Sequence, residues 1–182
     1  MSCTKCCHCP HQTMWNDTDT PLAYLISFRT HGTWLHGDNR GSIDRYHNSY
    51  GSPYIAPNES WHTYNQELLK APPQILDARQ RQSVKTSILE TCNRRQWSLL
   101  AVNVRTNHIH AVVTANRIAE FVLNALKANA TRQLRKEGHW THAFSPWADK
   151  GSKRMLWNEQ SVTRAIDYVL NGQGEDLPNF DD

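Results

Sequence analysis

The sequence predicts an α+β protein: a ferredoxin-like βαββαβ sandwich with an antiparallel sheet and one added C-terminal helix. Two adjacent β-forming segments are separated by a short turn, which indicates a hairpin. A segment with helical periodicity lies on each side of this hairpin, and a single β-forming segment lies beyond each helix. This order of elements is that of a split βαββαβ fold.

The elements before the hairpin are a strand, a long connection and a helix. Residues 22–30 (LAYLISFRT) are rich in β-forming side chains and predict the first strand. Residues 31–73 are dense in Gly, Asn, Ser, Pro and aromatic side chains without a clean period, so we interpret them as a long connection. Residues 76–96 repeat apolar side chains every four residues and predict a helix, in which Cys92 is a small core residue.

The hairpin itself consists of residues 97–105 (WSLLAVNVR) and 108–114 (HIHAVVT), joined at Thr106-Asn107. The second predicted helix covers residues 117–136. Its expected apolar face consists of Ile118, Phe121, Val122, Ala125 and Leu126.

The last two predicted elements are a fourth strand over residues 153–157 and a helix over residues 161–170. Asn158 is suited to cap this helix and Gly172 to end it. We divide the chain into a Cys- and His-rich arm (1–20), one domain (21–175) and an acidic tail (176–182).

Four cysteines crowd the N-terminal arm. The spacing of Cys3 and Cys6 is typical of zinc ligands, but a structural zinc site usually has a second ligand pair at a distance. Cys7 and Cys9 are too close to supply that pair. A metal-scavenging or redox-sensitive arm is therefore favoured over a folded zinc site.

The composition fits one domain without a membrane partner. The chain has 182 residues, enough for its own core. No apolar run approaches the roughly 18 residues of a membrane span, and no signal peptide is recognisable, so we expect a cytoplasmic protein. The net charge is only +3, but basic side chains gather on the two predicted helices, where they can neutralise phosphates. From charge alone, solvated helix surfaces are the simpler explanation.

His108-Ile109-His110 opens the second strand of the hairpin. Alternate side chains of a strand share a face, so both imidazoles point to the same side, about 6.6 Å apart at the backbone. That separation lets both bind one metal ion, while Ile109, Ala111 and Val113 take the opposite face. A lone His-x-His also recurs by chance as exposed or structurally bonded histidines.

Tyr168 on the last predicted helix is the second candidate for chemistry. At about 100° per residue, its side chain lies roughly 110° from the centre of the apolar stripe. A boundary tyrosine with a packed ring and a solvated hydroxyl fits the same pattern. The stripe consists of Val162, Ala165, Ile166 and Val169.

A strand with His-hydrophobe-His, followed by a helix, a strand and a helix with one tyrosine, resembles the HUH single-tyrosine transposases. That family includes the small insertion-sequence transposases and the REP-associated tyrosine transposases. The first strand and its sequel, LISFRTHGTWL, are also similar to the family's opening strand. The resemblance runs from about residue 22 to residue 173 and depends on the motif, the order of elements and the tyrosine together.

The resemblance implies that His108 and His110 bind Mg²⁺ or Mn²⁺ and that Tyr168 is the nucleophile. The tyrosine would attack a phosphate of single-stranded or hairpin DNA, forming a 5′-phosphotyrosine link and releasing a 3′-hydroxyl. Reversal with a different 3′-hydroxyl would rejoin the strand elsewhere. A phenol is a poor nucleophile unless activated, and a metal ion can polarise the phosphoryl oxygens. Family members occur as monomers and as dimers, so a homodimer is left open.

The chain departs from the family pattern one helical turn after Tyr168. These transposases often carry Gln or Asn four residues after the tyrosine as a third metal ligand, and that position is Gly172 here. We expect Gln173 to act instead, because the glycine can loosen the helix end and let the side chain reach back. Asn171 is the alternative ligand.

Other basic and aromatic side chains are candidates for DNA contact. For Arg29 and His31, near the end of the first strand, a DNA contact and an ordinary surface role are both open. The stretch from Trp140 to Arg154 suits either a single-stranded DNA groove or a loop pinned by its aromatic rings, and the aromatic residues of the long connection are open in the same way. The DNA-binding candidates are Arg29, His31, Lys127, Arg132, Arg135, Lys153 and Arg154.

Three other functions are compatible with parts of the pattern. A domesticated relative could bind hairpin DNA or RNA without cutting, and Gly172 favours this reading. A ferredoxin-like RNA-binding module would stack bases on aromatic strand residues, but HIHAVVT has none. A zinc protein organised by the N-terminal cysteines is the weakest alternative.

Overall fold

The computed structural model describes residues 20–42, 53–175 and 177. Their strand order is β2-β3-β1-β4, and every neighbouring pair is antiparallel. This order confirms the predicted ferredoxin-like sandwich with an added C-terminal helix. The strands are β1 (Ala23–Arg29), β2 (Ser98–Val104), β3 (His108–Thr114) and β4 (Ser152–Leu156), and the helices are α1 (Glu59–Glu67), α2 (Ala78–Arg94), α3 (Ala119–Lys136) and α4 (Glu159–Asn171).

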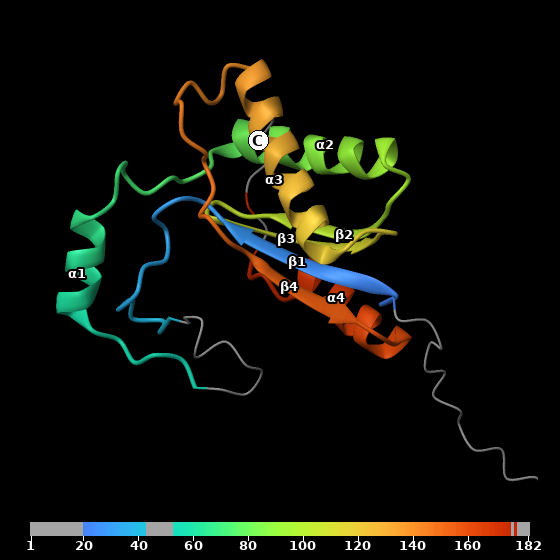
Figure 1. Cartoon of the computed structure of the whole chain (residues 1–182), viewed down its shortest axis with the longest axis horizontal. Coiled ribbons are helices and arrows are strands. Elements are labelled where there is room, and N and C mark those ends of the chain that lie inside the picture. The colour runs from blue at the N-terminus through green and yellow to red at the C-terminus, as the bar shows by residue number, and fades with distance from the viewer. Residues whose placement is uncertain (1–19, 43–52, 176, 178–182) are drawn as a thin grey trace, which may run out of the picture.

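The sheet separates two layers of helices, with α2 and α3 on one face and α4 on the other (Figure 1). The alternation of β3 assigns these faces to its side chains. Ile109 and Val113 belong to the core that contains residues of α2 and α3. Val112 belongs to the smaller core under α4. His108 and His110 share the parity of Val112, so they lie on the α4 face.

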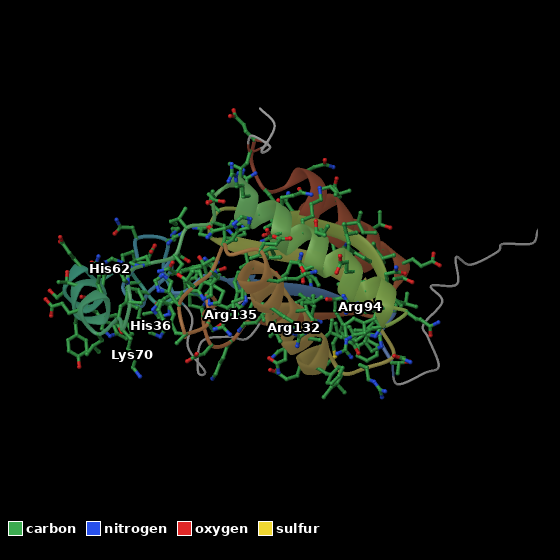
Figure 2. The ribbon with its side chains drawn as sticks, turned by 90° about the horizontal axis from the view of Figure 1, so that it is seen from above. His36, His62, Lys70, Arg94, Arg132 and Arg135 are labelled. Atoms are coloured by element: carbon green, nitrogen blue, oxygen red, sulfur yellow. The ribbon has the colours of Figure 1, made fainter. Side chains whose placement is uncertain are left out.

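Helix α1 lies within the connection for which the sequence predicted no regular structure. It begins after Asn58, whose side chain accepts a hydrogen bond from the Trp61 backbone N–H at 2.9 Å. None of its residues is buried, so its sequence carries no apolar stripe that could have predicted it. Figure 2 shows α1, with His62, apart from the helices that carry Arg94 and Arg132.

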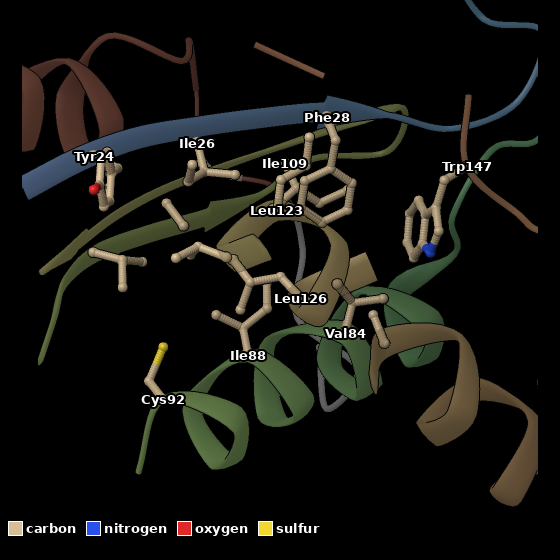
Figure 3. Packing of buried hydrophobic residues seen from close by; sticks show 14 of the residues in the cluster. Tyr24, Ile26, Phe28, Val84, Ile88, Cys92, Ile109, Leu123, Leu126 and Trp147 are labelled. Carbon is tan, nitrogen blue, oxygen red and sulfur yellow. The ribbon is translucent and has the colours of Figure 1, made fainter. Parts of the chain in front are cut away.

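The main core packs between the sheet and helices α2 and α3 (Figure 3). Cys92 is buried there as predicted, and burial raises the pKa of its thiol to about 11, so it stays protonated at neutral pH. Fully buried members include Ile26, Phe28, Val84, Ile88, Ile109, Leu123 and Leu126.

The predicted apolar face of α3 was wrong at two positions. Ile118 precedes the helix as its N-cap residue and is 72% exposed, and Phe121 is 41% exposed at the helix edge. The prediction of Val122 and Leu126 is confirmed, since both are fully buried. The buried stripe continues through Leu123, one position away from the expected centre, and this shift turns Phe121 towards solvent.

Several predicted features lie outside the described residues: Cys3, Cys6, Cys7 and Cys9 of the arm, Tyr46 and Tyr50 of the long connection, and most of the acidic tail. In the part of the chain that the structure describes, no helix is long and apolar enough to cross a membrane.

Deleting residues 1–20 is expected to leave folding nearly unchanged. All described strands and helices lie between Ala23 and Asn171, so the free energy of unfolding should change by no more than about 0.5 kcal/mol, as for ordinary surface changes. Thermal unfolding of the truncated protein beside the full chain measures this. A large loss of stability, reproduced by a chelator on the full chain, would show instead that the cysteines hold a structural metal.

Candidate active site

Two adjacent strands bring polar side chains together on the α4 face of the sheet. The antiparallel register pairs Arg29 of β1 with His108 of β3, and Ser27 with His110. These four side chains share one face, because residues two apart on a strand point the same way. The tight hairpin before β3, in which Arg105 N–H donates to the His108 carbonyl at 2.9 Å, sets where the histidine pair begins.

The two imidazoles lie with their ring centroids 5.0 Å apart. Nδ1 of His110 is 2.6 Å from the Ser27 hydroxyl oxygen, and Nδ1 of His108 is 2.7 Å from Oδ1 of Asn107. Both rings therefore use Nδ1 for a neighbouring polar group and leave Nε2 for another partner. Sequence reasoning missed Ser27 and Asn107, because only the strand pairing and the hairpin geometry reveal them.

Both histidines are held in the neutral form. Burial lowers the pKa of His108, and burial lowers the pKa of His110 to about 4. The positive charge of Arg29 lowers both further. At neutral pH each ring therefore carries one N–H and one lone pair, which is the form that binds metal ions.

Helix α4 places Tyr168 beside the histidines. The helix begins after Asn158, whose side chain accepts a hydrogen bond from the Ser161 backbone N–H at 2.9 Å, as predicted. Ala165 and Val169 are buried against the sheet, and Tyr168 stays 45% exposed, off this stripe. Its ring centroid is 5.3 Å from that of His110, so the structure brings the predicted nucleophile next to the predicted ligands.

Of the two candidates for a third ligand, the structure brings Gln173 to the histidines and leaves Asn171 away. Oε1 of Gln173 is 3.2 Å from Nε2 of His108, and its amide nitrogen donates to the Tyr168 carbonyl at 2.9 Å. The Asn171 amide donates to Asp167 at 2.8 Å instead. Among the described residues, no three His, Cys, Asp or Glu side chains form a metal-binding group, so a third ligand from this part of the chain would be of another type.

Gly172 explains how Gln173 reaches this position. A Cβ at residue 172 would lie 3.0 Å from Cδ2 of Tyr168 and 2.8 Å from its carbonyl oxygen. The absence of a side chain lets the chain turn closely around Tyr168 at the end of α4. As a result, the amide of Gln173, five residues after Tyr168, lies beside His108.

Arg29 and His31, the two DNA-binding candidates near the end of β1, have different surroundings. The guanidinium of Arg29 lies 3.3 Å from the centre of the Trp34 ring, and burial lowers its pKa to about 10, which keeps it charged at neutral pH. The ring centroid of His31 is 6.0 Å from that of Phe144, and its buried Nε2 has no hydrogen-bond partner among the described residues.

Two basic side chains of α3 hold the connection between α3 and β4. Nζ of Lys127 donates to the Ala148 carbonyl at 2.6 Å, and Arg135 donates to the Ala143 carbonyl at 2.9 Å. The ammonium of Lys127 and one guanidinium nitrogen of Arg135 are thus used within the protein. Arg132, which bonds to Asn129, lies exposed on the helix layer opposite α4 (Figure 2).

Lys153 and Arg154, the two DNA-binding candidates on β4, lie on opposite faces of the sheet. Lys153 forms an ion pair with Glu120 of α3. Arg154 is paired in register with Leu25 and shares the α4 face.

The aromatic rings of this connection pin it to the core. Trp147 is only 3% exposed, packs edge-on against Phe28 at 5.1 Å, and its indole N–H donates to the Lys127 carbonyl at 3.0 Å. Trp140 is 5% exposed. Of the two alternatives that the sequence left open, these two residues fit the loop pinned by its aromatic rings, because buried rings cannot stack on bases. In the long connection, Tyr54 and Tyr64 remain exposed.

Comparison with known proteins identifies the family. The family described as IS200-like transposases matches residues 68–160, slightly more than half of the 182 residues, and the chain therefore belongs to it. The matched stretch contains both histidines and ends before Tyr168. No curated protein matches the chain.

The solved structures that resemble the chain include these two. One is a REP-associated tyrosine transposase bound to a REP hairpin, with 11% identity, a TM-score of 0.46, and coverage of 88% of this chain and 70% of that chain. The other is a protein from Deinococcus radiodurans R1 assigned as a transposase, with 13% identity, a TM-score of 0.47, and coverage of 87% and 96%.

Proposed function

We propose that this IS200-like transposase cleaves and rejoins single-stranded or hairpin DNA through a covalent link between Tyr168 and a 5′-phosphate, with Mg²⁺ or Mn²⁺ as cofactor. The observation that carries the proposal is the convergence of His108, His110, Gln173 and Tyr168 on one face of the sheet. These residues come from β3 and from the end of α4, which are distant in sequence and meet only in the fold.

The donor set fits a divalent metal ion. When Nδ1 of His108 donates to Oδ1 of Asn107, Nε2 carries a lone pair and faces Oε1 of Gln173 at 3.2 Å. Two acceptors at that distance repel each other unless a cation lies between them. The hydrogen bonds that the Nδ1 atoms form, His108 with Oδ1 of Asn107 and His110 with the Ser27 hydroxyl, are the outer contacts that orient metal-binding imidazoles.

All three proposed ligands are neutral, so a bound ion would keep its full charge for the DNA. That charge would polarise the phosphoryl oxygens and stabilise the negative charge that develops at phosphorus. Tyr168 supplies the nucleophile: its phenol loses a proton and its oxygen forms a bond to phosphorus. The bond from phosphorus to the 3′-oxygen breaks, and that oxygen leaves as a 3′-hydroxyl after taking up a proton. Attack by another 3′-hydroxyl would reverse these bond changes.

The polarity of the covalent link provides a direct test. Single-stranded oligonucleotides of random sequence, labelled at either end, are incubated with the protein and Mn²⁺ or Mg²⁺. A label at the 3′ end should appear in a protein–DNA adduct on a denaturing gel, and a label at the 5′ end should appear in a shortened free strand. EDTA should remove both products. Binding of hairpin DNA or RNA without any adduct would contradict the proposal and favour a non-cleaving relative.

Gln173→Ala is expected to reduce metal-dependent cleavage at least about tenfold, the lower end of what losing a supporting contact in a metal site costs. Asn171→Ala, two residues away on the other side of Gly172, is the matched control and should cleave like the wild type, because its amide contacts Asp167. The Mn²⁺ concentration that gives half-maximal cleavage measures the effect. Equal metal dependence in both variants would remove Gln173 from the ligand set.

A further inference from the structure

Arg29 places a guanidinium beside the proposed active site. It is the last residue of β1 and is paired in register with His108, so its side chain lies on the same face as both histidines. The residue is half-buried. Within the described part of the chain, its guanidinium has no carboxylate at ion-pair distance and no hydrogen bond. It stacks on the Trp34 ring, 3.3 Å from the ring centre.

A second arginine at the same indole is neutralised. The guanidinium of Arg40 lies 5.1 Å from the Trp34 ring centre and binds both carboxylate oxygens of Asp38, at 2.7 and 2.6 Å. This pairing holds the pKa of Asp38 well below its usual range. Arg40 and Asp38 together add no net charge, and the histidines are neutral. Among these groups, the charge of Arg29 is therefore the one that is not balanced.

A half-buried charge without a counter-ion is costly, and an anion placed beside it recovers that cost. The stack on Trp34 holds one face of the guanidinium and leaves its N–H groups in the plane, where they match the oxygens of a phosphate. Tyr168 lies at the same face, with its ring centroid 5.3 Å from that of His110. The anion that the proposed reaction brings to Tyr168 is a phosphodiester.

We propose that Arg29, held by Trp34, binds a non-bridging oxygen of the phosphate that Tyr168 attacks. This inference rests on the function proposed above. Negative charge on the non-bridging oxygens must be stabilised as a phosphoryl group is transferred, and a donor that is already fixed in place needs no reorganisation during the reaction. Arg29 is thus a catalytic residue, and Trp34 is a positioning residue that acts through it.

Substitutions of Arg29 test this role against a matched control. Arg29→Ala should slow single-turnover cleavage roughly 100-fold, the effect of removing one fixed donor from an oxyanion site, and should change oligonucleotide affinity much less. Arg29→Lys should recover part of the rate. Arg95→Ala is the control, because Arg95 also lies over a tryptophan, 5.2 Å from the Trp97 ring centre at the far end of α2, and it should cleave like the wild type.

The positioning role of Trp34 is tested by conservative rescue. Trp34→Ala should slow cleavage in the same direction as Arg29→Ala, and Trp34→Phe, which keeps a ring under the guanidinium, should restore most of the rate. Equal rates for both Trp34 variants would show that the stack does not position Arg29.

A neutral phosphate analogue tests the contact itself. The oligonucleotide is resynthesised with a methylphosphonate at the cleaved position, which replaces a charged non-bridging oxygen by a methyl group. Wild type and Arg29→Ala should then react at nearly equal rates, because the oxygen that Arg29 binds is missing. An undiminished difference between them on this substrate would overturn the proposal, as would a wild-type rate for Arg29→Ala on the normal substrate.

A measurement without cleavage separates this inference from the proposed function. The ¹⁵N-labelled protein is titrated in EDTA with the dinucleotide TpT and with its methylphosphonate analogue. The Nε–H signal of Arg29 should move with TpT and stay in place with the analogue, while that of Arg95 stays in place with both. If no adduct ever forms, the proposed function fails and this titration still decides whether Arg29 binds phosphodiester. An unmoved Arg29 signal overturns the inference even if Tyr168 is the nucleophile.

Discussion

Tyr168→Phe is expected to abolish covalent attachment of the protein to single-stranded DNA. The substitution removes only the hydroxyl oxygen that would bond to phosphorus and keeps the ring beside His110. Because Tyr168 is 45% exposed and lies off the buried stripe of α4, the variant should fold normally and keep most of its DNA affinity. A denaturing gel with a 3′-labelled oligonucleotide and Mn²⁺ measures the adduct.

Tyr64→Phe is the matched control for this substitution. Tyr64 is also an exposed tyrosine on a helix, 58% exposed on α1, and its variant should form as much adduct as the wild type. Persistent adduct in Tyr168→Phe would show that another residue is the nucleophile and would contradict the assignment of Tyr168.

His108→Ala and His110→Ala are expected to lower metal-dependent cleavage by at least about 1,000-fold, because a metal ion supplies several kcal/mol of transition-state stabilisation. Neither substitution should unfold the domain, since both side chains lie outside the main core. Loss of the contact between His110 and Ser27 should cost about 1 kcal/mol, which corresponds to a fall in Tm of roughly 2–4 °C. Single-turnover cleavage and thermal unfolding on the same samples measure both effects.

His139→Ala is the control for these variants, because His139 is half-buried near Glu137 and away from β3. It should cleave like the wild type. If His108→Ala or His110→Ala melted far below the wild type and yet cleaved normally when folded, the histidines would be structural residues.

The low pKa of His110 adds a pH dependence with a defined sign. An unfolded histidine binds a proton near pH 6.5, and the folded one does so only near pH 4. The folded protein should therefore lose stability as the pH falls from about 6.5 towards 4, because the unfolded chain takes up the proton first. His110→Ala should show a smaller fall in Tm between pH 7 and pH 5 than the wild type. An equal fall would mean that His110 is not held neutral by its surroundings.

Most of the fold was predictable because its elements have clear periods. The β2–β3 hairpin and the two long helices carry alternating or four-residue apolar patterns, and β3 was predicted with the bounds that the structure has. Helix α1 could not be predicted, because it buries no side chain and so leaves no pattern. The burial of Trp147 was also hidden, since its indole bonds to the distant Lys127 carbonyl.

The candidate site was also predictable only in part. The shared direction of His108 and His110 follows from strand geometry alone, and the exposure of Tyr168 follows from helix geometry. The approach of Gln173 to His108 depends on the close turn at Gly172 around Tyr168. The pairing of Arg29 with His108 depends on the register between β1 and β3, which no local sequence pattern reveals.

The most direct test of the central claim is the mass-spectrometric identification of the residue that carries DNA after reaction with Mn²⁺. The covalent adduct is digested with nuclease and protease, and the modified peptide is sequenced. The proposed function predicts a nucleotide that is linked to the Tyr168 oxygen through its 5′-phosphate. This product should be absent when EDTA replaces the metal. A nucleotide on any other residue, or a link to a 3′-phosphate, would contradict it.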